Sequence, residues 1–220
     1  MKFKLKIPTD LSEIKLKDYQ KYMKMVVENE DAVDFLNRKA VEIFCNVKIK
    51  DFNTIEAADF DDIVNTIDIT LKQTPELIRR FKLNGVEYGF KPDIEKLTMG
   101  EYPDAEGYLS DVQDWHRALA VLYRPITFKG KNEMYLIEEY EGSDKYCDIM
   151  KYAPLDVMIS VNVFFYRLGM VLLKHTLHYL EEEVQTNIQA KQILEENGVG
   201  IRAFMHLLEE NLESLKTSLN

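Results

Sequence analysis

The chain has few of the residues that mark linkers, fibres and disulfide-rich domains. Its 220 residues include two cysteines, six prolines and nine glycines, too few for a repetitive or linker-rich protein. Cys45 and Cys147 lie far apart in the sequence, and a chain of this size builds a core without a disulfide. We therefore expect two reduced cysteines and a reducing cytoplasm.

Long apolar runs are also scarce. Residues 1–7 alternate Lys with apolar side chains, which predicts a strand and not a secretory signal. The longest apolar stretch, 155–173, contains Asp156 and Arg167, and such charges are costly in hydrocarbon. We therefore predict a central buried helix over residues 155–180, and no membrane partner.

An excess of positive charge is missing as well. The chain has 28 Lys and Arg against 38 Asp and Glu, a formal charge of −10, which disfavours binding to nucleic acid or anionic lipid. No glycine motif for phosphate binding occurs. With 46% hydrophobic and 30% charged residues, the chain has the composition of a folded, soluble domain.

Helical spacing of apolar residues dominates the first third. It predicts one helix from Asp18, a second that follows the acidic pair Glu30-Asp31, and a third over residues 55–71, which Thr74-Pro75 ends.

The middle of the chain predicts two hairpins. Asn84-Gly85 separates two alternating runs within residues 80–90, and this pair suits a tight turn that needs positive φ twice. A second hairpin is predicted for residues 126–137, around the loop 129–132. With the first strand, these hairpins give a small antiparallel sheet in an α+β fold that is mostly helical.

Between and after the hairpins, three further segments are assigned. Residues 97–108 are expected to be turn-rich. A helix begins at Asp111 or Asp114, and Pro125 stops it. A short helix then runs to Met150.

The last residues differ from the rest in charge. From 181 to 220 there are eight glutamates against three Lys and Arg, so we divide the chain into a helical α+β body, 1–184, and an acidic amphipathic helical tail, 185–220. The apolar stripe of the tail needs a covering surface on its own body, on a symmetry mate or on a partner protein. It consists of Ile201, Phe204, Leu207, Leu208, Leu212 and Leu215.

Two histidine regions are the candidates for chemistry. His175 and His178, with Glu182 a turn later, would share a helix stripe that suits a metal ion, but the His-Glu-x-x-His spacing of zinc hydrolases is absent. His116 is a candidate general base, oriented by Asp114 or Asp111. The simpler readings are a packed or solvated helix end and an ordinary helix histidine.

No nucleophile in a strained turn accompanies these histidines, so we expect no enzyme, no metal and no cofactor. The distinctive residues Trp115 and Arg124 have structural readings, as a core anchor and as a helix cap paired with nearby acids. Both are kept as interaction candidates.

Several segments together resemble a known group of proteins. These are the opening that ends in Ile7-Pro8, the hairpin 84–90, residues 99–102, the run 115–125, and Phe164-Phe165-Tyr166-Arg167-Leu168-Gly169. In this order they resemble proteins of the virion and tail assembly modules of tailed bacteriophages, over residues 1–175.

The resemblance implies a non-enzymatic role as a tail assembly chaperone or minor virion component. Its partners would be other phage structural proteins or its own copies, with no small-molecule substrate, in the host cytoplasm during assembly or in the virion. The interaction candidates are Trp115, Arg124, Phe164, Phe165, Ile201, Phe204, Leu208 and Leu212.

Two alternatives remain open. One is a small metal-dependent or acid/base enzyme that uses the His175/His178 or His116 region. The other is a phage regulator whose acidic surface binds a basic host protein.

Overall fold

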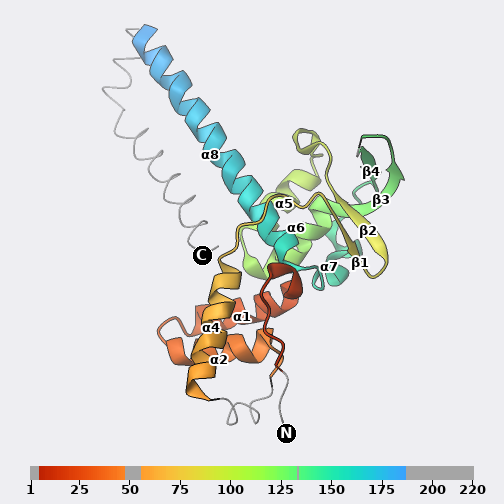
Figure 1. Ribbon diagram of the computed structural model, residues 1–220. Coiled ribbons are helices and arrows are strands. Elements are labelled where there is room, and N and C mark those ends of the chain that lie inside the picture. Colours follow the sequence, from red (N-terminus) through yellow and green to blue (C-terminus); the bar gives the residue numbers. More distant parts are fainter. Residues whose placement is uncertain (1–4, 48–55, 133, 187–220) are drawn as a thin grey trace. The chain divides into compact units, whose positions relative to one another are not determined.

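The computed structural model describes residues 5–47, 56–132 and 134–186 (Figure 1). The chain divides into two compact units, residues 1–161 and 162–220. The boundary expected at 184/185 lies at the edge of the described residues and stays a prediction. The fold class is α+β and mostly helical, with one small antiparallel sheet, as the sequence predicts.

Three helices pack together in the first unit: α1 (Leu16–Glu28), α2 (Val33–Phe44) and α4 (Ala57–Leu71). Apolar side chains at helical spacing meet in a shared cluster, which stabilises helices that would be marginal alone. The buried members of the cluster are Ala40, Val41, Cys45, Val47, Ile63 and Ile67.

The predicted hairpin at Asn84-Gly85 is confirmed. Strands β1 (Arg80–Leu83) and β2 (Val86–Phe90) pair antiparallel, and both turn residues have positive φ, 50° and 82°. The second hairpin is also present, as β3 (Tyr123–Lys129) and β4 (Tyr135–Ile137). Pairing of β2 with β3 joins the hairpins into a four-stranded sheet of order β1-β2-β3-β4.

Helix α6 (Trp115–Leu122) leads directly into β3. Pro125 lies inside β3, and the helix ends before it because the residue preceding a proline is disfavoured in helical conformation. The short predicted helix before Met150 is present as the 3₁₀ turn η4 (Ser143–Lys145) followed by α7 (Cys147–Met150). The helix predicted to begin at Asp111 or Asp114 is present: Asp111 caps the 3₁₀ helix η3 (Val112–Asp114), which continues as α6.

The prediction for residues 97–108 is wrong, because these residues include the helix α5 (Glu101–Leu109). Its start is a capping box: the Glu101 N–H donates to Thr98 Oγ1 at 3.2 Å, and the Thr98 N–H donates to Glu101 Oε2 at 2.8 Å. Pro103 is tolerated because it lies in the first turn, where backbone N–H groups have no helical acceptor.

The predicted first strand is also corrected. Residues 1–4 lie outside the described residues, and residues 5–7 belong to no helix or strand. Alternation of Lys with apolar residues cannot show whether a neighbouring strand exists. The nearby backbone instead meets the start of α8 (Leu155–Thr186), where Leu16 N–H donates to Ala153 O at 2.9 Å and Leu155 N–H to Ile14 O at 2.8 Å.

Helix α8 is buried over a shorter length than predicted. Residues 155–161 are buried with the exception of the half-buried Asp156, whereas most of residues 164–170 are half-buried and His175 is exposed. The expectation of a buried helix over 155–180 therefore fails at Val171, Lys174 and His175, which are exposed. The side chains of residues 172–173 and 176–180 lie outside the described part of the structure. None of the helices in the described ranges is long and apolar enough to span a bilayer.

Candidate functional site

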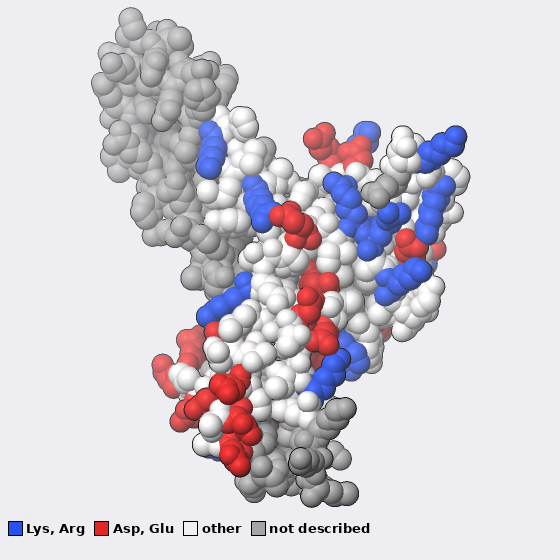
Figure 2. Space-filling view, in the orientation of Figure 1, with Lys and Arg blue, Asp and Glu red and all other residues white. Residues whose placement is uncertain are grey.

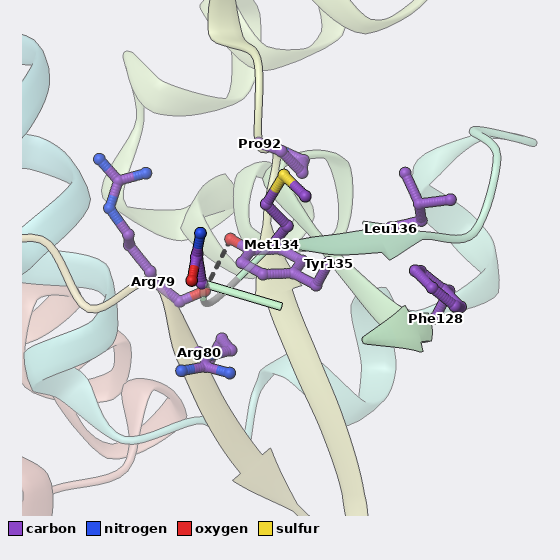
Figure 3. Close-up of a pocket in the computed structure, with 8 residues that line it drawn as sticks. Arg79, Arg80, Pro92, Phe128, Met134, Tyr135 and Leu136 are labelled. Atoms are coloured by element: carbon purple, nitrogen blue, oxygen red, sulfur yellow. Dashed lines mark hydrogen bonds between the residues drawn. The ribbon is translucent and has the colours of Figure 1, made fainter. Parts of the chain in front are cut away.

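A hollow of about 760 Å³ lies on the β3–β4 hairpin (Figure 3). Its lining combines side chains of the hairpin with two arginines at the start of β1 and a proline two residues after β2. These residues are Arg79, Arg80, Pro92, Phe128, Asn132, Met134, Tyr135 and Leu136.

Three apolar side chains of this hollow are exposed to solvent. Phe128 and Leu136 are register partners on β3 and β4, and their exposed fractions are 59% and 61%. Met134, just before β4, is 67% exposed. Three large apolar residues gathered at one surface hollow are typical of a site that another molecule covers.

Tyr135 supports the hollow from within the sheet. Its ring packs against Gly89, where a Cβ atom would lie 2.5 Å from Tyr135 Cε2. The Tyr135 hydroxyl contacts two backbone oxygens, Phe90 O at 2.7 Å and Arg79 O at 3.2 Å, the second of which is drawn in Figure 3. This close approach fixes the chain that enters β1 against β4, and so holds the arginine side of the hollow in place.

Lys and Arg gather near the hollow. Residues 79–91 and 126–137 contain six Lys and Arg against two Glu, although the whole chain is acidic. Figure 2 shows Lys and Arg gathered over this part of the surface. Lys129 Nζ lies 2.5 Å from Glu87 Oε2, and this bond lowers the pKa of Glu87. The surface near the hollow is therefore basic on the side of these two hairpins, whereas Asp93, Glu138 and Glu139 line the adjoining hollow.

A second hollow, of about 650 Å³, shares Pro92 and Leu136 with the first. Glu101, Arg124 and Lys91 are among its lining residues. Arg124 Nη2 donates to Glu101 Oε1 at 2.6 Å, and Lys91 Nζ contacts both Glu101 oxygens at 3.0 and 2.9 Å. Burial acts to raise the pKa of Glu101, but the bonds from Thr98, Lys91 and Arg124 outweigh it and lower the pKa to about 2.

The structure places two of the predicted interaction residues in the interior. Trp115 is 5% exposed, stacks on Tyr19 with ring centroids 5.7 Å apart, and donates from Nε1 to Leu109 O at 3.2 Å. Arg124 is 2% exposed and bound to Glu101. The interpretation of Trp115 as a core anchor and of Arg124 as a partner for an acid fits these positions. Arg124 does not cap a helix, however, because it lies in β3.

Phe164 and Phe165 are half-buried, and their rings contact each other with centroids 5.3 Å apart. They remain interaction candidates. The other four candidates, Ile201, Phe204, Leu208 and Leu212, lie outside the described residues.

The structure does not assemble the predicted acid/base group around His116. His116 Nδ1 lies 3.1 Å from Gln20 Nε2. Asp111 accepts from the Gln113 N–H at 2.8 Å, and Asp114 lies 3.7 Å from Arg117. Burial, with the positive charges of Lys151 and Arg117, lowers the pKa of His116, which favours the neutral ring.

The histidines of α8 do not form a described metal site. His175 is exposed, and the side chains of His178 and Glu182 lie outside the described part of the structure. Among the side chains that are described, no three His, Cys, Asp or Glu are grouped as metal ligands would be. Cys45 and Cys147 are both free and buried.

Sequence reasoning missed the exposed hollow. The hairpin 126–137 was predicted, but its alternating residues gave no sign of which face would lie against the rest of the protein. A usable signal was the concentration of Lys and Arg in the two hairpins of an acidic chain.

Comparison with known proteins adds no identification. No family model matches the chain, and neither a curated protein nor a solved structure does.

Proposed function

We propose that the protein is a non-enzymatic bacteriophage assembly or structural protein that acts through protein–protein contacts. One observation carries the proposal: the hollow of the β3–β4 hairpin exposes Phe128, Met134 and Leu136 by about three-fifths or more of their surface. Apolar side chains clustered in this way gain free energy when a partner covers them.

The phage context comes from the resemblance of residues 1–175 to proteins of virion and tail assembly modules. In that context the protein is a tail assembly chaperone or a minor virion component. A chaperone leaves before the particle is complete, whereas a component stays in it. The two roles therefore predict different locations, in assembly intermediates in the host cytoplasm or in the mature virion.

Mass spectrometry of purified particles and of assembly intermediates tests the proposal. We expect the protein in at least one of the two fractions. A phage that carries Met134→Glu with Leu136→Glu should lose this incorporation, because the charges oppose burial of the hollow. The matched control is Met99→Glu, at a methionine that is 91% exposed and outside the hollow. Absence of the wild-type protein from both fractions would contradict the proposal.

A further inference from the structure

The hollow of the β3–β4 hairpin specifies the chemistry of its occupant. Its exposed apolar residues require apolar side chains opposite them, and the nearby Lys and Arg favour negative charge. The occupant is therefore acidic and carries apolar side chains at short spacing.

A protein segment meets these requirements better than a nucleic acid. Two of the three exposed apolar residues of the hollow, Met134 and Leu136, are aliphatic and offer no flat surface on which a base stacks. A short acidic segment is attracted by the local excess of Lys and Arg.

A sequence with this chemistry lies in the C-terminal part of the chain. Residues 203–215 include three glutamates, Glu209, Glu210 and Glu213, and no Lys or Arg. They also carry five large apolar residues at spacings of one to four, in addition to Met205. These are Phe204, Leu207, Leu208, Leu212 and Leu215.

We infer that residues 203–215 of a second copy of this chain bind the hollow of the β3–β4 hairpin. The inference rests on the proposed function, in which the protein's own copies are among its partners, and it names the segment and the surface that make the contact. Two copies that exchange these segments reciprocally form a closed two-fold dimer, while one-way exchange extends into a ring or a filament.

Sedimentation velocity and light scattering on the full-length chain test the inference by charge reversal. One variant combines Arg79→Glu with Lys131→Glu at the hollow, where both side chains are exposed. The other combines Glu209→Lys with Glu210→Lys. The matched control is Lys21→Glu with Lys24→Glu, the same charge change at two exposed residues of α1. Thermal melts followed by circular dichroism establish that each variant folds.

We expect the wild-type mass to rise with concentration to at least twice 25.8 kDa and the association to weaken as salt is added. Each of the two reversed variants should associate at least tenfold more weakly, and the control should not. An equimolar mixture of the two reversed variants should recover association, because hollow and segment again carry opposite charges.

Three results would overturn the inference. A wild-type chain that stays at 25.8 kDa at every concentration shows that the occupant is not a second copy. Association that is indifferent to both charge reversals shows that the contact lies elsewhere. Retention of labelled single-stranded DNA by the wild type, lost in Arg79→Glu with Lys131→Glu, would assign the hollow to nucleic acid. In each case incorporation into particles remains a separate measurement, so the proposed function is tested independently.

Discussion

Arg124 of β3 and Glu101 of α5 form a buried ion pair, with Arg124 Nη2 2.6 Å from Glu101 Oε1 and both side chains at most 3% exposed. Lys91, which follows β2, shares the same carboxylate. One carboxylate therefore joins the first turn of a helix to the sheet. The hairpin that carries the hollow includes β3, the strand that this network anchors.

Removing the carboxylate should be strongly destabilising. Glu101→Ala leaves the charge of Arg124 buried without a counter-ion and removes half of the capping box with Thr98. We expect a loss of about 3–5 kcal/mol in the free energy of unfolding, measured by urea denaturation. Glu106→Ala, at an exposed position of the same helix, should change it by less than about 0.5 kcal/mol.

The same network allows a second test. Nε and Nη1 of Arg124 are buried and have no hydrogen-bond partner among the described residues, so the pair is incompletely compensated. Because an apolar pair of similar volume avoids this cost, Glu101→Leu combined with Arg124→Met should be more stable than Glu101→Ala by about 1–4 kcal/mol. A double variant no more stable than Glu101→Ala would show that the ion pair itself is required.

Glu101 also predicts a dependence of stability on acid. Its pKa in the folded protein is about 2, below the ordinary value of 4.5, so the folded state favours the ionised form. The resulting stabilisation is complete above about pH 4.5 and is lost as the pH falls toward 2, by about 3 kcal/mol in all. Urea denaturation between pH 2 and 6 measures this loss, which should be largely absent in Glu101→Gln; equal slopes would contradict the assignment.

The sequence predicted features that depend on a few adjacent residues. Asn84-Gly85 specified its hairpin because the turn itself requires positive φ at both positions. The Glu101–Arg124 pair joins residues 23 positions apart, and no local pattern links them. Local sequence patterns did not predict the hollow either, because the exposure of its side chains depends on how β3 and β4 are placed.

The misassigned helix α5 was different, since its signal was local. Thr98 and Glu101 have the spacing of a capping box, but Gly100 and Pro103 in the same segment favoured the prediction of turns. The buried part of α8 was predicted too long for another reason. The apolar pattern of residues 155–173 continues past the point where burial ends. Hydropathy depends on composition alone and does not show whether a neighbouring element covers the helix.

The contact between Gly89 and Tyr135 gives a prediction about the hollow itself. Gly89→Ala places a methyl group 2.5 Å from Tyr135 Cε2 and 3.0 Å from Ile126 Cγ1, so the Tyr135 ring must shift. Overpacking of this kind costs about 1–3 kcal/mol. The shift also disturbs the bonds from the Tyr135 hydroxyl to Phe90 O and Arg79 O, which weakens the arginine side of the hollow.

Gly107→Ala is the matched control, because Gly107 lies in α5 with no atom within 4 Å of its added Cβ. There alanine should leave stability unchanged or raise it by up to about 1 kcal/mol, since alanine favours helix. Urea denaturation of both variants compares the two effects, and amide hydrogen exchange over residues 123–137 should increase in Gly89→Ala alone. If Gly89→Ala is as stable as the wild type, with unchanged exchange, then the Tyr135 ring does not rest on Gly89 and the hollow is not held in the way described.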